Sequence, residues 1–384
     1  MAQILIRYAE IALKGGNRGK FEDQLALNIK TALGKGGYRL VRQNKQLVLT
    51  VKSNLINKSL EKLQRVFGIA WFAPVKETIS QVGKIKQAAV RLTGGWDRKV
   101  ATFAVRAARQ DKNLPFTSLE LERKVGEVVR VKTSLKVDLG KPDKTLYIVA
   151  AKKKALVFDQ KIPGAGGLPV GTSGKVLSLV SGGFDSIVAS YLLAKRGATV
   201  DFLHFHVFAD PKKVLDSKIK TIVDGLKPWT LSQKLYLAAY TPFQMAVLDL
   251  AGRDARQELV TFRRLMVRVG QKLAQKLGYQ ALVLGDSLGQ VASQTMENIV
   301  AVDQAVNLPI FRPLIGSDKQ EVINLVKNLG LESAAIAPYK DCCSIISAHP
   351  ATKADSKRVK FIEEKIKINT IIDEITRETK TIHL

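Results

Sequence analysis

The residues with the clearest chemical potential lie in one short turn. An apolar stretch at residues 176–180 leads into the turn, and a segment with helical spacing of apolar residues follows it. Two glycines let the backbone approach a phosphate closely, two serines offer hydroxyl groups, and a helix start presents unpaired N–H groups and a positive dipole. The sequence therefore predicts a turn that holds pyrophosphate, with Ser181, Gly182, Gly183, Asp185 and Ser186.

Asp185 would repel a phosphate that it touched directly, so a carboxylate here is suited to hold a Mg²⁺ that bridges phosphates. A Walker A loop reads G-x-x-x-x-G-K-[ST], but residues 171–176, the nearest stretch, have the wrong spacing and no hydroxyl after Lys175. Residues 181–186 match SGGxDS instead, the PP-loop of enzymes that split ATP into AMP and pyrophosphate. The alternative is a glycine turn that only joins a strand to a helix.

Histidines and arginines further along the chain have two interpretations each. His204 and His206 lie two apart on an expected strand and share one of its faces. They either belong to a metal site, for which no third ligand is evident, or border the nucleotide pocket at the edge of an open sheet. Arg263, Arg264 and Arg268 fall on one expected helix. They either neutralise phosphate or form a solvated basic face.

The elements that position these residues begin at Lys175. Apolar strands there alternate with longer helices, at residues 176–180, 187–195, 199–206, 259–277 and 281–284. This pattern is typical of a doubly wound α/β domain with a parallel sheet. Residues 162–174 are rich in Gly and Pro and predict an interdomain linker of irregular, solvated backbone.

The N-terminal part of the chain has the pattern of small α+β units. We expect a strand and its exit at residues 3–13, further strands at 46–51 and 99–109, an apolar patch at 71–75, and a hairpin at 145–158 with its tip at 152–154. Helices are expected at residues 21–33, 59–67 and 84–92, and a capping box of Thr117 and Glu120 opens another that ends near Lys132. The basic residues of that last helix are suited to meet phosphates.

Composition narrows the class of protein and its partners. The 384 residues include 61 Lys and Arg against 34 Asp and Glu, a formal charge of +27 that predicts a polyanionic partner. Adjacent Cys342 and Cys343 are the only cysteines, which excludes a disulfide framework and a thiolate set for zinc or an iron–sulfur cluster. No stretch approaches the length of a membrane span, so we expect a cytoplasmic protein without a membrane partner.

Several stretches together resemble the tRNA 4-thiouridine synthetases, the ThiI family, over nearly the whole chain. Besides the PP-loop they are Arg7-Tyr8-Ala9-Glu10, Lys14, Asn17-Arg18, residues 166–172, residues 285–295, residues 312–315 with Asp318-Lys319, and Asp341-Cys342-Cys343. The resemblance implies an α/β PP-loop ATP pyrophosphatase domain at residues 166–384. A ferredoxin-like domain at 1–58 and an RNA-binding THUMP domain at 59–165 would precede it.

The resemblance also implies a reaction and its residues. ATP would adenylate the C4 oxygen of uridine 8 in tRNA, and a persulfide sulfur would displace AMP. By matching positions, the residues that line the ATP pocket would be Leu179, Val180, His204, Phe205, Arg263, Gly285 and Gln294. Asp185 would serve the metal and the phosphates, and Lys319 would stabilise charge during adenylation. Cys343 would handle the sulfur, because a thiolate accepts and passes sulfane sulfur.

Many family members carry a rhodanese domain, whereas this chain ends at Leu384, so we expect the short form without one. Either a cysteine desulfurase then loads Cys343, with Cys342 resolving the product, or sulfide is used without a protein carrier. One rival function is a PP-loop enzyme with a nitrogen nucleophile, and a second is a tRNA-binding module with an inactive ATP site. The sequence leaves open whether the chain forms a homodimer and whether it also supplies sulfur for thiamine thiazole synthesis.

Overall fold

The protein divides into two compact units. A computed structural model describes residues 1–8, 10–43, 46–342, 346 and 350–384. The first unit is Met1–Gly167 and the second is Leu168–Leu384. Within the described ranges, no helix is long and apolar enough to cross a bilayer. Each unit has its own sheet and its own buried core.

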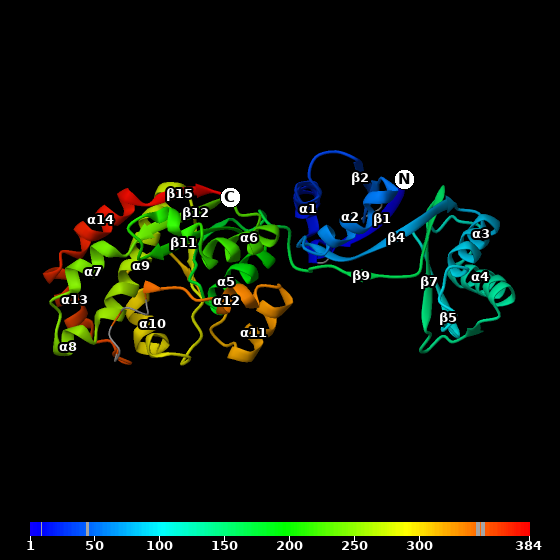
Figure 1. Ribbon diagram of the computed structural model, residues 1–384. Coiled ribbons are helices and arrows are strands. Elements are labelled where there is room, and N and C mark those ends of the chain that lie inside the picture. Colours follow the sequence, from blue (N-terminus) through cyan, green and yellow to red (C-terminus); the bar gives the residue numbers. More distant parts are fainter. Residues whose placement is uncertain (9, 44–45, 343–345, 347–349) are drawn as a thin grey trace. The chain divides into compact units, whose positions relative to one another are not determined.

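The first unit is built on a nine-stranded sheet with the order β2-β3-β1-β4-β8-β7-β5-β6, and β9 also pairs with β4. The long strand β4 pairs with β1 through its first half and with β8 through its second half, so one strand serves both halves of the unit (Figure 1). The bounds are β1 (Ala2–Tyr8), α1 (Arg18–Leu33), β2 (Tyr38–Gln43), β3 (Gln46–Val51), α2 (Ile56–Leu63), β4 (Ile69–Ile79), α3 (Val82–Thr93), β5 (Thr102–Arg109), α4 (Ser118–Thr133), β6 (Lys136–Val137), β7 (Lys144–Ala150), β8 (Lys154–Phe158) and β9 (Ile162–Pro163).

Strand alternation sorts the apolar side chains of this unit into separate cores. Ile4 and Ile6 of β1 join the core beside α1 and α2, whereas Leu5 points to the other face. A second core lies between the sheet and helices α3 and α4. The Leu5 face continues through Ala73 to Phe158, so this third cluster packs the two halves together.

Most expected elements of the first unit are present. The capping box of Thr117 and Glu120 opens α4, and the expected hairpin is formed by β7 and β8. The strand expected with its exit over residues 3–13 is β1, which ends at Tyr8, and 3-10 helices follow at Glu10–Leu13 and Gly15–Asn17. The edge strand β2 was not predicted, because only half of its residues are shielded and its apolar signal is weak.

The second unit contains a six-stranded sheet with the order β14-β13-β10-β11-β12-β15, parallel except for β15. Its strands are β10 (Lys175–Leu179), β11 (Thr199–His206), β12 (Lys234–Ala239), β13 (Ala281–Val283), β14 (Ile310–Phe311) and β15 (Lys380–His383). Its helices are α5 (Phe184–Lys195), α6 (Lys218–Thr230), α7 (Thr241–Val247), α8 (Gly252–Ala255), α9 (Glu258–Leu277), α10 (Met296–Asp303), α11 (Lys319–Asn328), α12 (Glu332–Ile336), α13 (Ser356–Lys365) and α14 (Ile368–Glu378).

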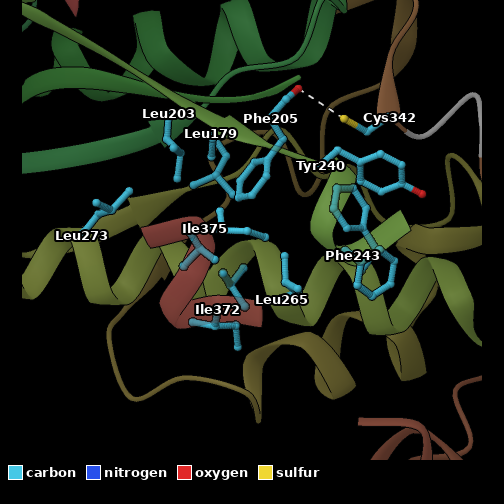
Figure 2. Close-up of a cluster of buried hydrophobic side chains, with 14 of the residues drawn as sticks. Leu179, Leu203, Phe205, Tyr240, Phe243, Leu265, Leu273, Cys342, Ile372 and Ile375 are labelled. Atoms are coloured by element: carbon cyan, nitrogen blue, oxygen red, sulfur yellow. Dashed lines mark hydrogen bonds between the residues drawn. The ribbon is translucent and has the colours of Figure 1, made fainter. Parts of the chain in front are cut away.

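Helices cover both faces of this sheet. Helices α5, α6, α11 and α12 pack with one another, and α9 packs with α10, α13 and α14 (Figure 1). The main core lies between the sheet and the second group, where Leu179 and Phe205 meet α9 and α14 (Figure 2). The arrangement confirms the predicted doubly wound α/β fold.

The Gly- and Pro-rich segment between the units is more ordered than expected. Gly164 and Gly166 donate backbone hydrogen bonds to the start of β4 in the first unit. Leu168 and Val170 are buried in the second unit, and the Gly171 N–H donates to the Gly197 carbonyl. The segment does lie between the two units, as predicted. The prediction that its backbone is irregular and solvated is wrong for much of it, because glycines here allow close backbone pairing.

Arg264 of α9 does not belong to a solvated basic face. Its side chain is 10% exposed and donates to both carboxylate oxygens of Glu363 on α13, at 2.8 and 3.2 Å. It also donates to the Ala301 carbonyl of α10. Arg268 reaches the same carboxylate at 3.7 Å. These arginines thus hold helices together instead of contacting phosphate.

We predict that Glu363→Ala lowers the free energy of unfolding by about 3–5 kcal/mol, because it leaves the Arg264 guanidinium buried without its counter-charge. The control is Asp373→Ala, which removes the exposed carboxylate that pairs with Lys272, another basic residue of α9. It is expected to lower the free energy of unfolding by less than about 1 kcal/mol. Urea denaturation followed by circular dichroism measures both. Equal, small losses would contradict the structural role of the Arg264 pair.

Candidate active site

The main cavity lies where the strand order of the second sheet reverses. From β10 the chain passes to β11 and β12 on one side, and then returns to β13 and β14 on the other. Such a reversal leaves a crevice at the carboxyl ends of the strands, where ligands bind in open α/β sheets. The cavity holds about 870 Å³ of space, including its open mouth. It is lined by Leu179, Val180, Ser181, Asp185, Ser186, Leu203, His204, Phe205, Phe262, Arg263, Met266, Val267, Leu284, Gly285, Asp286, Ser293, Gln294, Asp341 and Cys342.

The turn between β10 and α5 is held together by its serines. Ser186 Oγ accepts a hydrogen bond from the Ser181 N–H at 3.2 Å and lies 3.1 Å from the Ser181 and Gly183 carbonyls. Ser181 Oγ accepts from the Gly183 N–H at 3.3 Å. Gly183 is the N-cap of α5 and has no side chain to cap the first turn of the helix. The N–H groups of that turn therefore remain suited to an anion.

Gly285 is required by a close approach of two backbones. A Cβ atom at this position would lie 2.7 Å from the Asp185 carbonyl carbon and 2.8 Å from the Ser186 nitrogen. Backbone atoms cannot rotate away from such a contact as a side chain can. The end of β13 thus lies directly against the first turn of α5, and only glycine fits between them.

Asp185 and Lys319 form an ion pair at the mouth of the cavity. The Lys319 Nζ donates to both carboxylate oxygens at 2.9 Å, and Gln290 Nε2 donates to one of them at 3.1 Å. Lys319 is the first residue of α11, behind a capping box of Asp318 and Glu321. A cation at a helix N-terminus opposes the helix dipole. The carboxylate of Asp185 offsets this unfavourable placement, and a phosphate would do the same.

Arg263 is bound to protein groups and forms part of the cavity wall. It donates to both oxygens of Asp286, at 2.6 and 2.8 Å, and to the Ser293 carbonyl at 2.7 Å. Arg312 donates to the same carboxylate at 2.8 Å. Because Asp286 is buried between two guanidinium groups, it fixes the segment that carries Gly285 and Gln294.

His204 is a neutral part of the pocket wall. Its Nδ1 lies 2.8 Å from the Val180 carbonyl, which can only accept, so Nδ1 carries the proton. Nε2 then accepts from the Tyr339 hydroxyl at 2.7 Å. Burial lowers the pKa of His204 to about 4. In the described part of the chain, no cluster of three or more His, Cys, Asp or Glu residues could hold a metal, so a metal site at His204 and His206 has no support.

Cys342 lies inside the cavity wall. It is 2% exposed, and its thiol donates to the Phe205 carbonyl at 3.3 Å (Figure 2). This burial does not favour the role of a resolving thiol for Cys342. Cys343, the residue expected to handle sulfur, lies outside the described residues.

The structure brings most of the expected site residues together. All seven residues expected to line an ATP pocket do line the cavity, as do Ser181, Asp185 and Ser186. Gly182 and Gly183 form the turn beside it, and Lys319 reaches it through Asp185. Sequence reasoning gave no role to Asp286, Gln290 or Arg312. Their contacts join segments distant in the chain, although all three residues occur in stretches that the resemblance had marked.

The fold and the turn define the second unit as an α/β nucleotide-binding domain of the PP-loop class. Comparison with protein-family models finds the thiamine biosynthesis protein (ThiI) at residues 171–368, the ThiI ferredoxin-like domain at 3–73 and the THUMP domain at 80–158. A probable tRNA sulfurtransferase from Caldanaerobacter subterraneus subsp. tengcongensis is 38% identical over 98% of both chains. One from Thermoanaerobacter pseudethanolicus is 37% identical over 98% of both.

A solved structure agrees with these relatives. The crystal structure of a 4-thiouridine synthetase–RNA complex with bound ATP matches with a TM-score of 0.90 and 27% sequence identity, and the match covers 100% of both chains. The chain belongs to the ThiI family. The family and its succession of ferredoxin-like, THUMP and PP-loop domains confirm the resemblance and the predicted fold class, while the exact limits 1–58, 59–165 and 166–384 stay predictions.

We predict that His204 makes stability depend on pH. Its folded pKa of about 4 lies below the ordinary 6.5, so the unfolded chain gains a proton between these values that the folded chain does not. Stability is therefore full above pH 6.5 and falls by at most about 3 kcal/mol as the pH drops to 4. His204→Gln should flatten this slope in urea denaturation series. Parallel curves for the two proteins would contradict the assignment.

Proposed function

We propose that this chain makes 4-thiouridine in tRNA, and that it uses ATP to activate the uridine. The observation that carries the proposal is the cavity at the sheet reversal, floored by the Ser181–Ser186 turn, in a chain of the ThiI family. The relatives named probable tRNA sulfurtransferases and the ATP-bound 4-thiouridine synthetase support it. In the first step, the C4 oxygen of uridine 8 attacks the α-phosphorus of ATP and pyrophosphate leaves. In the second, sulfur attacks C4 and AMP leaves with the oxygen.

The nucleotide occupies the main cavity. Apolar side chains of Leu179, Val180 and Phe205 are suited to pack against the adenine, and His204 is a neutral wall beside it. Gly285 and Gln294 complete the opposite wall, which Arg263 holds through its bond to Asp286. The pyrophosphate portion lies on the turn, where Gly182, Gly183 and the start of α5 offer N–H groups.

Asp185 and Lys319 serve the phosphates. A single carboxylate is sufficient for Mg²⁺, which keeps several waters and takes its other ligands from phosphates, so Asp185 fits such an ion. The Mg²⁺ would neutralise phosphate charge when bound. In this structure the Lys319 Nζ donates to both Asp185 oxygens. Its side chain is 45% exposed, which leaves room for it to rotate. We infer that it moves from Asp185 to the charge that develops on the leaving pyrophosphate.

Cys343 carries the sulfur in this proposal, as a persulfide loaded by a cysteine desulfurase. The terminal sulfur attacks C4 and expels AMP, which leaves an S–S bond between Cys343 and the base. A second thiol must then cleave that bond, so that 4-thiouridine is released and a disulfide forms. Because Cys342 is buried, a thiol from outside the pocket is the better candidate for this step.

The RNA partner is tRNA. The charge of +27 and the exposed Arg123, Lys124 and Lys132 on α4 of the THUMP region favour a polyanion. We place the chain in the cytoplasm, where tRNA is available. The family description suggests a second role in thiamine synthesis, which we include in the proposal. We also include a homodimer, and the geometry of the site bears on neither.

Two rival functions would have different products. An enzyme with a nitrogen nucleophile would release pyrophosphate but leave no 4-thiouridine in tRNA. A binding module with an inactive ATP site would release no pyrophosphate. The intact pair of Asp185 and Lys319 opposes the second rival, and the named relatives oppose the first.

We predict that Asp185→Asn and Lys319→Met each lower tRNA-dependent pyrophosphate release at least about 100-fold. Asp185 would hold the Mg²⁺ and Lys319 would contact the leaving pyrophosphate, and both of these cations stabilise the negative charge of the transition state. Filter binding of tRNA should change less than about twofold and weaken with added salt in all variants. Lys327→Met, an exposed lysine of the same helix paired with Glu332, is the matched control. Normal pyrophosphate release by either site variant would overturn the role.

A further expectation separates adenylation from sulfur transfer. Cys343→Ala should keep pyrophosphate release and lose 4-thiouridine formation with a desulfurase and cysteine, because only the sulfur carrier is removed. The near-ultraviolet absorbance of 4-thiouridine in tRNA measures the product. Cys342→Ala is the neighbouring control and should retain thiolation. If Cys343→Ala thiolates at the wild-type rate, sulfur reaches the base without this residue.

A further inference from the structure

Lys218 lies against the nucleotide-binding turn, although no motif drew attention to it. It is the first residue of α6, directly after the N-cap Ser217. A Cβ atom on Gly182 would lie 2.2 Å from Lys218 Cε and 3.0 Å from its Nζ. The ammonium group is therefore beside the part of the turn that holds pyrophosphate in the proposed function.

Two of the three N–H groups of this ammonium have protein partners. The Lys218 Nζ donates to the Ala335 carbonyl at 2.9 Å and to the Ala337 carbonyl at 2.8 Å. Both carbonyls lie at the C-terminal end of α12, where the helix dipole is negative. One N–H remains without a partner among the described residues. Burial lowers the pKa of Lys218, and the nearby Asp341 acts in the opposite direction.

Lys218 and Lys319 have the same unusual placement. Each is the first residue of a helix, α6 or α11, where a cation opposes the dipole, and both helices pack beside α5. Lys319 reaches the turn from the side of Asp185, and Lys218 reaches it from the side of Gly182. An anion on the turn would offset both unfavourable placements.

The segment that Lys218 holds leads to the cysteines. Beyond Ala337, the Tyr339 hydroxyl donates to His204 at 2.7 Å, and the Cys342 thiol donates to the Phe205 carbonyl at 3.3 Å. His204 and Phe205 both line the nucleotide cavity. Every one of these contacts thus joins the segment before Cys343 to the nucleotide site.

We propose that Lys218 is a further pyrophosphate-binding residue, whose third N–H donates to a β- or γ-phosphate on the turn while the other two hold the segment 335–342. It thereby positions the cysteine segment when ATP is bound. The inference rests on the proposed function, because it takes ATP as the ligand. A lysine that only held the carbonyls of α12 would have no preference among adenine nucleotides.

Comparison of ATP with AMP tests this difference, because AMP lacks the two phosphates that Lys218 would contact. Isothermal titration calorimetry with Mg²⁺ should show that Lys218→Gln weakens ATP binding at least about tenfold, as expected for loss of a charged hydrogen bond. Its affinity for AMP should change less than about twofold. Lys218→Arg keeps the charge and should recover part of the ATP affinity. Lys220→Gln, which removes a surface lysine of α6 paired with Asp224, is the matched control.

The outcomes separate this inference from the proposed function. Equal weakening of ATP and AMP, or no weakening of either, would overturn the role of Lys218 in binding pyrophosphate. If circular dichroism shows that Lys218→Gln does not fold, the ratio of ATP affinity to AMP affinity is compared between Lys218→Arg and the wild type. An unchanged ratio contradicts the inference. A wild-type chain that binds ATP but releases no pyrophosphate with tRNA would contradict the proposed function, while the ATP and AMP comparison would still decide the role of Lys218.

Discussion

The contact between two backbones at Gly285 is the constraint on which the site depends. The end of β13 touches the first turn of α5 so closely that no side chain fits there. This contact closes one wall of the cavity directly over the Ser181–Ser186 turn. It also fixes Asp286, whose carboxylate holds Arg263 and Arg312. The crevice that every open α/β sheet has at its reversal point is thereby narrowed into a pocket with defined walls.

The charged side chains of the site are of two kinds. Some are buried against a counter-charge and have a structural role, and others are placed where they could also meet an anionic ligand. Asp286 is buried between two arginines and has a structural role, as does Arg264 with Glu363. Lys319 and Lys218 instead stand at helix N-termini, where the helix dipole opposes their charge. Asp185 offsets this placement for Lys319, two carbonyls at the end of α12 do so for Lys218, and a bound anion would add to both. In our proposal Lys218 already lies beside the turn, whereas Lys319 has to move from Asp185, and both cations are then suited to stabilise a leaving pyrophosphate.

Sequence predicted the fold well because local patterns determine it. The strand, turn and helix around Ser181 follow from apolar spacing and glycine placement, and the capping box of α4 follows from two residues three apart. The contacts that sequence reasoning missed are those between residues distant in the chain. The pairing of Arg264 with Glu363 spans 99 positions in the chain, and nothing near Arg264 distinguishes it from the surface arginine that its helix pattern allowed. The same holds for Lys218, which meets carbonyls 117 and 119 positions away.

The contacts of the segment before Cys343 bear on the order of the two chemical steps. An adenylated uridine is reactive towards water, so the sulfur nucleophile has to be close when it forms. A segment anchored at Lys218, His204 and Phe205 lies against residues that line the cavity proposed to hold ATP. In our proposal ATP contacts Lys218, so its binding acts on a group that holds this segment. The segment ends directly before the cysteine proposed to carry the sulfur. Separate pockets for adenylation and for sulfur transfer would need the RNA to move between them, whereas sulfur transfer beside the proposed ATP cavity would let one bound uridine undergo both steps.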